Sequence, residues 1–196
     1  MAERALREPP SHQTPIGGVE DFLDWAERQQ ERYEFVGGRV RAMASATVEH
    51  STIAANVLVE LGSRLRAGPC RPRDGSAGVR QGENFLSPDV TVSCVPESGR
   101  TLRHPVLIIE ILSPSTANVD RGEKWTLYRT LESLRHYLLI EQHRMAAELL
   151  SRNDAADAWT LSLHEGADAV LRLDALDVSL PLSELYRGID FEAPAA

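Results

Sequence analysis

The chain has 196 residues and a formal net charge of −8, and its 42% hydrophobic and 26% charged residues are ordinary globular composition. This length predicts one domain with a sizeable core. The negative charge disfavours broad binding of a polyanion, because backbone affinity for nucleic acid comes from Lys and Arg. No segment approaches the roughly 20 continuous apolar residues of a membrane helix, and the first residues lack the apolar middle of a signal peptide. We therefore expect a soluble, cytoplasmic protein that has no membrane partner.

The first half of the chain predicts a helix, a hairpin and a long second helix, after a flexible segment over 1–17. Apolar residues at helical spacing predict the first helix over 19–30. Gly37-Gly38 predicts the turn of a hairpin with strands near 32–36 and 39–44. Thr47 is the expected cap of a helix over 47–67, whose apolar face begins at His50.

The second half predicts several strands around one further helical segment. Strands are expected over 77–81, 88–95, 104–112, 135–142, 144–152, 158–164 and 174–180. After the strand that ends at residue 112, a loop leads into a helix that extends to about 134, and a short helix over 181–188 closes the fold before a tail over 191–196. The order of elements predicts one domain over 18–190 of α/β or α+β class, with a mixed β-sheet flanked by helices.

The two cysteines and a group of arginines carry weaker signals. Cys70 and Cys94 do not make a disulfide framework, so we expect core residues or free thiols. The arginines between the long helix and the next strands could be a solvated surface or a local basic strip. They are Arg64, Arg66, Arg71, Arg73 and Arg80.

One carboxylate stands inside the most apolar stretch, PVLIIEIL at 105–112. Glu110 lies near the C-terminal end of this expected strand, where open α/β sheets commonly bind ligands. An isolated carboxylate buried there is costly, so it must be paired, protonated or bound to a metal. The helix that follows carries a stripe at positions i, i+3, i+4 and i+7 that should face the sheet: Lys124, Leu127, Tyr128 and Leu131. Lys124 and Glu110 could therefore offset each other's charge.

Lys124 is also unusual by composition, since it is the one lysine among 21 basic residues. It could mark a place where a compact ammonium is needed, or be a matter of chance. Asp89, which follows Pro88 at the start of another strand, could be a turn residue or lie beside Glu110. Two such carboxylates could bind a hard cation such as Mg²⁺, and a lysine beside them could position a water or stabilise negative charge. A buried structural ion pair is the plain alternative.

Four segments together carry a family resemblance: YEFVGGRV, EHSTIAANVLVEL, SPDVTV and PVLIIEILSPSTANVDRGEKWTLYR. They resemble the Uma-two family of restriction-endonuclease-like proteins, within the PD-(D/E)xK nuclease-like superfamily, from about residue 18 to about 150. The resemblance implies a restriction-endonuclease-like core with its site on the central strands. It also implies hydrolysis of DNA phosphodiester bonds with Mg²⁺ or Mn²⁺ as cofactor.

Carried over residue by residue, the resemblance implies that Asp89 and Glu110 are catalytic acids and metal ligands, with the carbonyl of Ile111 as a further ligand. Lys124 would be the catalytic lysine. The superfamily usually has it at the position of Leu112, whereas members of this type carry it on the next helix. The resemblance adds Glu34, which could support a second metal or a metal-bound water. It also implies supporting roles for three residues: His50, Asp120 and Tyr128. The family often has an acidic residue in the hairpin turn, where this chain has glycine.

Two of these residues have plainer interpretations. His50 could equally be a core or capping histidine, and Tyr128 is expected to pack, with its hydroxyl near the site.

Three hypotheses from different classes remain. The first is a metal-dependent endonuclease. The second is a nuclease-fold module that binds nucleic acid or protein without cleavage. The third is a structural protein whose acid–lysine cluster is only a buried ion network. The net charge favours the second and third, and the complete catalytic set favours the first. The apolar strands after residue 135 could close the sheet or form a homodimer contact, which would suit double-strand cleavage.

Overall fold

The structure is a computed structural model that describes residues 16–43, 45–153 and 158–191. Its helical elements are α1 (Val19–Ala26), α2 (Val48–Arg64), α3 (Ala117–Val119), the π-helical turn η1 (Asp120–Lys124), α4 (Trp125–Tyr128), the 3-10 turn η2 (Asp174–Leu176) and α5 (Leu182–Leu185). Its strands are β1 (Tyr33–Val36), β2 (Arg39–Ala42), β3 (Arg71–Asp74), β4 (Val79–Gln81), β5 (Asn84–Leu86), β6 (Val90–Ser93), β7 (Pro105–Leu112), β8 (His136–Glu141), β9 (Ala146–Asn153), β10 (Ala158–Glu165), β11 (Val170–Leu173) and β12 (Val178–Pro181).

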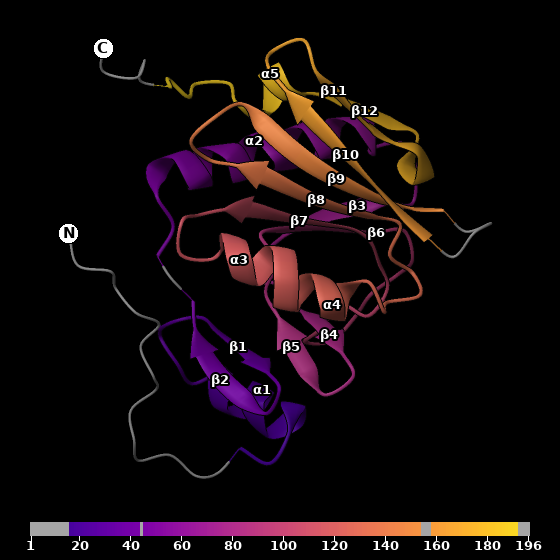
Figure 1. The fold of residues 1–196 in the computed structure, drawn as a ribbon. Coiled ribbons are helices and arrows are strands. Elements are labelled where there is room, and N and C mark those ends of the chain that lie inside the picture. Colours follow the sequence, from indigo (N-terminus) through magenta and orange to yellow (C-terminus); the bar gives the residue numbers. More distant parts are fainter. Residues whose placement is uncertain (1–15, 44, 154–157, 192–196) are drawn as a thin grey trace.

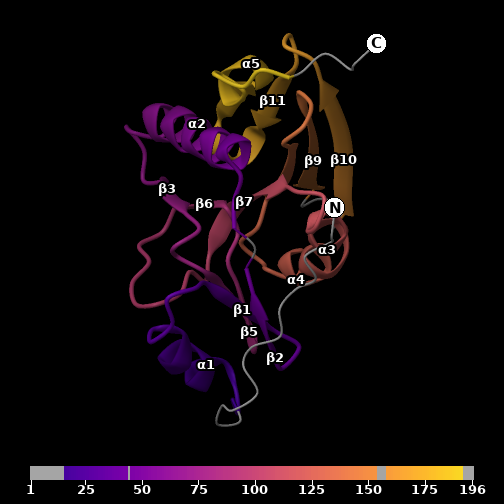
Figure 2. The same cartoon turned by 90° about the vertical axis from the view of Figure 1, so that its left-hand side faces the viewer.

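A six-stranded sheet in the order β10-β9-β8-β7-β6-β3 forms the centre of the molecule. It is mixed, because β7 and β8 run parallel while the other neighbours run antiparallel. A four-stranded sheet, β2-β1-β5-β4, and the pair β11-β12 complete the fold. Figures 1 and 2 show α2 on one side of the large sheet and the α3–α4 segment on the other. The predicted class, a mixed sheet flanked by helices, is confirmed, but the strands divide among three sheets.

The long helix α2 begins where its sequence predicts. Thr47 accepts a hydrogen bond at 3.1 Å from the backbone N–H of His50, which satisfies one of the unpaired donors of the first turn. The helix buries Ile53, Val57 and Leu61 against one face of the large sheet. It ends at Arg64, three residues before the expected end at 67.

The strand β7 is buried on both faces, as its continuous apolar run predicts. Leu107, Ile109 and Ile111 belong to the core under α2. Ile108 and Leu112 belong to a second core, which they share with Tyr128 and Val36 from the α4 helix and the four-stranded sheet. Glu110 therefore points toward the α3–α4 side.

Several local features differ from the sequence prediction. The strands β3, β5 and β11 were not expected, and the helical segment after β7 covers 117–128, shorter than predicted. Its middle turn is π-helical. The expected strand over 174–180 begins only at Val178, because η2 precedes it and Asp177 adopts a left-handed conformation with φ 51°.

The expectation for the cysteines was wrong. Cys70 and Cys94 form a disulfide bond. They stand next to the paired residues Arg71 and Ser93 of β3 and β6, so the strand pairing itself brings the two sulfurs together. The sequence offers no signal for this pairing, since β3 was not predicted.

The expected flexible segment over 1–17 lies outside the described residues except for Ile16 and Gly17, and the tail over 191–196 lies outside them except for Phe191. Phe191 packs on Tyr186 with ring centroids 5.5 Å apart. In the described part of the chain, no helix has the length and apolar character that a membrane crossing requires. The strands β8, β9 and β10 belong to the large sheet and extend it to an open edge at β10, and the expected homodimer contact of these strands stays a prediction.

Candidate active site

Lys124 lies at the centre of three carboxylates that come from three different elements. Its Nζ is 3.1 Å from Glu110 Oε1 on β7, 3.2 Å from Glu34 Oε1 on β1 and 3.2 Å from Asp120 Oδ1 at the start of η1. All four side chains are at most 10% exposed. The fold thus joins the central strand, the N-terminal hairpin and the π-helical turn at one buried ammonium group.

The electrostatics of this cluster are dominated by burial and by an excess of acid. Burial raises the pKa of Glu110 well above its ordinary value, against the opposing attraction of Lys124, and the neighbouring acids raise it further. Burial likewise raises the pKa of Asp120. For Lys124, burial alone would lower the pKa, but attraction by Glu110, Glu34 and Asp120 outweighs it and raises the pKa well above the ordinary value. The ammonium therefore stays charged at neutral pH.

Hydrogen bonds hold the carboxylates in place around the ammonium. The Tyr128 hydroxyl donates to Glu110 Oε1 at 3.1 Å, one turn of helix after Lys124. The Ser87 backbone N–H donates to Glu34 Oε1 at 2.9 Å. Both acids are thereby fixed by neutral donors as well as by the lysine, which is the usual condition for keeping a charge buried.

Asp89 stands at the more exposed side of the same cluster. Because Val90 pairs with Ile109, the residue before β6 lies next to the end of β7. Asp89 Oδ2 accepts a hydrogen bond at 2.7 Å from the backbone N–H of Ile111 and lies 3.2 Å from Nε2 of His50. Its charge also contributes to the raised pKa of Glu110. Asp89 and Glu110 are neighbours, as the sequence predicts.

The structure therefore brings together every side chain predicted for the site. Glu34, Glu110 and Asp120 contact Lys124 directly, Tyr128 joins them through Glu110, and His50 contacts Asp89. Ile111 contacts Asp89 through its N–H, while its carbonyl as a metal ligand stays a prediction.

Leu112 is the position at which the resemblance would have placed a lysine. Leu112 is 2% exposed and belongs to the apolar core on the α3–α4 side. The ammonium instead reaches the acids from η1.

Some carboxylate oxygens of Asp89 and Glu110 make no other contact in the cluster, and they suit a metal ion that keeps most of its water ligands. Among the described residues, no set of three or more His, Cys, Asp and Glu side chains is arranged to hold a metal ion. Glu110 uses Oε1 for Lys124 and Tyr128, and Asp89 uses Oδ2 for Ile111 and His50, so Glu110 Oε2 and Asp89 Oδ1 are the oxygens left. Mg²⁺ in substrate-dependent sites is commonly held by one or two carboxylates together with waters and substrate phosphates. The residues present fit such an ion.

The sequence profile of the Uma2 family, described as "Putative restriction endonuclease", matches residues 19–183. The chain belongs to the Uma2 family. A relative described as "Uncharacterized protein slr1290", from Synechocystis sp., is 32% identical over 187 residues, which cover 93% of this chain and 97% of that protein. A second Synechocystis protein, "Uncharacterized protein sll1609", is 30% identical over 136 residues, or 66% of this chain and 77% of its own.

A solved structure shares the fold of this Uma2 chain. The crystal structure of "a putative nuclease belonging to DUF820" from Anabaena variabilis superposes with a TM-score of 0.72 and covers 86% of this chain and 97% of its own. Its sequence identity is 16%, so the likeness concerns the fold. The expected nuclease-like core is thereby confirmed.

The arginines between α2 and β5 do not form one basic strip. Arg64 pairs with Glu60 on its own helix, and Arg80 pairs with Glu20 of α1. Arg71 and Arg73 lie on the edge strand β3. The charges of Arg64 and Arg80 are thus balanced by neighbouring acids, which disfavours a nucleic-acid track through these two positions.

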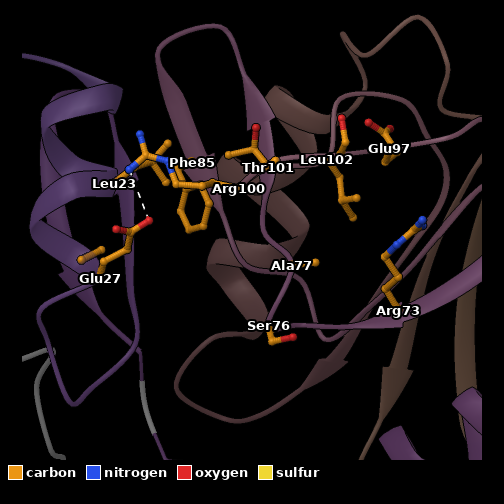
Figure 3. A pocket seen from close by; sticks show the side chains of 13 residues that line it. Leu23, Glu27, Arg73, Ser76, Ala77, Phe85, Glu97, Arg100, Thr101 and Leu102 are labelled. Carbon is orange, nitrogen blue, oxygen red and sulfur yellow. Dashed lines mark hydrogen bonds and ion pairs between the residues drawn. The ribbon is translucent and has the colours of Figure 1, made fainter.

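A cavity of about 480 Å³ also lies away from the acidic cluster of this Uma2 chain, between α1 and the loop before β7. Figure 3 shows Leu23 and Phe85 on its wall, with Arg100 directed to Glu27. Arg100 donates to Glu27 at 3.3 Å and pairs with Asp24 and Glu20, so its charge is already balanced.

Sequence reasoning missed two groups around the site. Arg41 makes a bidentate ion pair with Glu123, which joins the hairpin to the turn that carries Lys124. Gln142 is buried and accepts a hydrogen bond from Thr47, the residue that caps α2. Arg41 could have been noticed from its place opposite Glu34 in the hairpin, whereas no local pattern marks Gln142.

Proposed function

We propose that this protein is a metal-dependent endonuclease that hydrolyses DNA phosphodiester bonds, with Mg²⁺ or Mn²⁺ as its cofactor. Membership of the Uma2 family supports a nuclease activity. The single observation that carries the metal dependence is the charge balance of the site. Three carboxylates, from Glu34, Glu110 and Asp120, surround one ammonium group, and a fourth, Asp89, lies near enough to raise the pKa of Glu110. Such an excess of buried negative charge is relieved by a bound cation.

Asp89 and Glu110 would hold the metal ion, with the Ile111 carbonyl as a further ligand. When bound, a divalent cation lowers the pKa of its water and polarises a phosphoryl oxygen. The chain's own residues would orient the reacting groups. Lys124 would keep Glu110 in place, and its positive charge would face the attacking water or the developing negative charge. His50 restrains Asp89, and Glu34 binds the ammonium together with Glu110.

Cleavage of DNA tests this proposal directly. Supercoiled plasmid and a labelled duplex would be incubated with Mg²⁺, Mn²⁺ or EDTA, using wild type, Asp89→Asn and Glu110→Gln. We expect cleavage by wild type in metal and none in EDTA or with either variant. Glu97→Gln is a matched control, because Glu97 is also a largely buried carboxylate, bound by the backbone N–H groups of Arg103 and His104 away from the cluster. Intact DNA with wild type under all metals would refute the nuclease assignment.

A non-catalytic module that binds nucleic acid or protein is the second candidate, and the net charge of −8 favours it. It predicts retention of a partner without cleavage. A homodimer and a cytoplasmic location also stay predictions, and the oligomeric state is measured by sedimentation.

A further inference from the structure

The side-chain amide of Gln142 is buried next to Thr47, the residue that caps α2. Gln142 follows the last residue of β8 and is 2% exposed. A buried amide is unfavourable unless its polar atoms are hydrogen-bonded. Gln142 Oε1 accepts a hydrogen bond from the Thr47 hydroxyl at 3.2 Å, and Nε2 lies 3.0 Å from His143 Nε2. The amide thus binds the residue that caps α2.

From Thr47 the contacts continue into the site. Thr47 Oγ1 accepts the backbone N–H of His50 at 3.1 Å, and a hydroxyl can donate one hydrogen bond while it accepts others. The His50 ring reaches Asp89 at 3.2 Å, and the same Asp89 oxygen accepts the N–H of Ile111 at 2.7 Å. A continuous chain of contacts therefore links the end of β8 to Asp89.

We propose that Gln142 is a positioning residue: it fixes the first turn of α2 so that His50 holds Asp89 in the orientation that leaves Oδ1 toward the metal ion. The His50 part of this inference stands on geometry alone, and the metal part rests on the proposed function. Outer-shell partners of metal ligands commonly change metal affinity by about 10- to 100-fold when they are removed.

A purely structural tie between α2 and the rest of the fold is the alternative, and Asn56 provides the matched control. Asn56 is an amide on the same helix, and its Nδ2 donates to the carbonyls of Leu185 at 3.0 Å and Arg187 at 2.9 Å, at the end of α5. It has no link to Asp89 in the described hydrogen bonds. If both amides are only structural, Gln142→Leu and Asn56→Leu should change the His50 ring signals and the Mn²⁺ affinity alike.

The experiment compares wild type with the two amide variants by two measurements. NMR on histidine-labelled, metal-free protein records the His50 ring signals, and calorimetry measures the affinity for Mn²⁺. Gln142→Leu should shift the His50 signals and weaken Mn²⁺ binding about 10-fold, while Asn56→Leu leaves both at the wild-type values. In a His50→Ala background, Gln142→Leu should cause no further loss of affinity. Unmoved His50 signals in Gln142→Leu, or equal changes in Asn56→Leu, would overturn the proposal.

A second pair of variants covers the case in which Gln142→Leu does not fold. Thr47→Val breaks the same chain and should move the His50 signals, whereas Thr47→Ser keeps the hydroxyl and should not. Equal signals for these two variants would count against the proposal. If wild type binds no Mn²⁺, the proposed function fails, and the His50 signals still decide whether Gln142 positions the ring.

Discussion

Lys124 and Glu110 touch at 3.1 Å from Nζ to Oε1, although one stands on a π-helical turn and the other in the centre of the sheet. Asp120 and Lys124 form the two ends of that turn, and both side chains are buried in the cluster. Single π-helical turns frequently occur at functional sites, because the extra residue re-aims the side chains of one turn. Here the turn carries an acid and the ammonium to the same point.

Removal of the ammonium should destabilise the fold strongly. Lys124→Ala leaves Glu34, Glu110 and Asp120 buried without their common partner, and breaking a buried pair in this way typically lowers the free energy of unfolding by about 3–5 kcal/mol. Urea unfolding at pH 7 measures the change. Arg144→Ala is the control, because this exposed arginine pairs with Glu165 at the surface and should cost about 1 kcal/mol or less. A loss below 1 kcal/mol for Lys124→Ala would show that the acids are not held charged.

Glu110→Gln should change how stability depends on pH. The folded-state pKa of Glu110 is raised above 4.5, so between pH 4.5 and that pKa the folded protein binds more protons than the unfolded chain. Wild type therefore loses stability as pH rises through this window, by at most about 1.4 kcal/mol per pH unit from this group. Glu110→Gln lacks this dependence on pH. Its free energy of unfolding relative to that of wild type should therefore increase with pH and level off above the folded-state pKa of Glu110.

Unfolding curves of both proteins from pH 4.5 to 9 measure that difference. Lys124 adds no slope there, since its pKa is raised above 10.5 and its stabilising charge is lost only at higher pH. Asp120 titrates in both proteins and cancels to first order. A difference that stays flat across the range, or that shrinks as pH rises, would contradict the raised pKa of Glu110.

Much of this site could be predicted because strand and helix periodicity decide where its side chains point. The alternation of β7 put Glu110 on one face with Ile108 and Leu112, and the spacing of Lys124 and Tyr128 put them on the inward face of the helix that follows. Both predictions are confirmed by direct contacts. The Thr47 cap of α2 is confirmed as well, since it depends only on local hydrogen bonding.

The features that were missed depend on partners distant in sequence. The strand β3 reads RPRD, with no apolar alternation, and it forms because one edge of β6 is open to pair with it. Without β3, nothing places Cys70 beside Cys94. Gln142 follows an ordinary buried strand, and only the tertiary approach of Thr47 gives its amide a role.

Tyr128→Phe should separate packing from catalysis at this tyrosine. The ring is fully buried in the core on the α3–α4 side, and the change keeps it while removing the hydroxyl that donates to Glu110 at 3.1 Å. Loss of a hydrogen bond to a charged group costs about 1.5–3 kcal/mol. We expect that loss in urea unfolding, with DNA cleavage reduced by less than about 10-fold. A complete loss of cleavage in a folded variant would instead assign the hydroxyl a part in the reaction.

Reduction of the disulfide should destabilise the protein without disturbing the acidic cluster. Cys70 and Cys94 are separated by 24 positions, and closing a loop of that length is worth about 3.5 kcal/mol in the chain-entropy treatment. Treatment with dithiothreitol, or Cys70→Ser with Cys94→Ser, should lower the unfolding free energy by roughly 2–4 kcal/mol. In a reducing compartment the pair would be thiols and this stabilisation would be absent. The bridge joins β3 to β6 at the end of β6 opposite Asp89, so Mn²⁺ affinity should be unchanged. A loss of metal affinity on reduction would mean that β6 must be clamped at its far end to hold Asp89 in place.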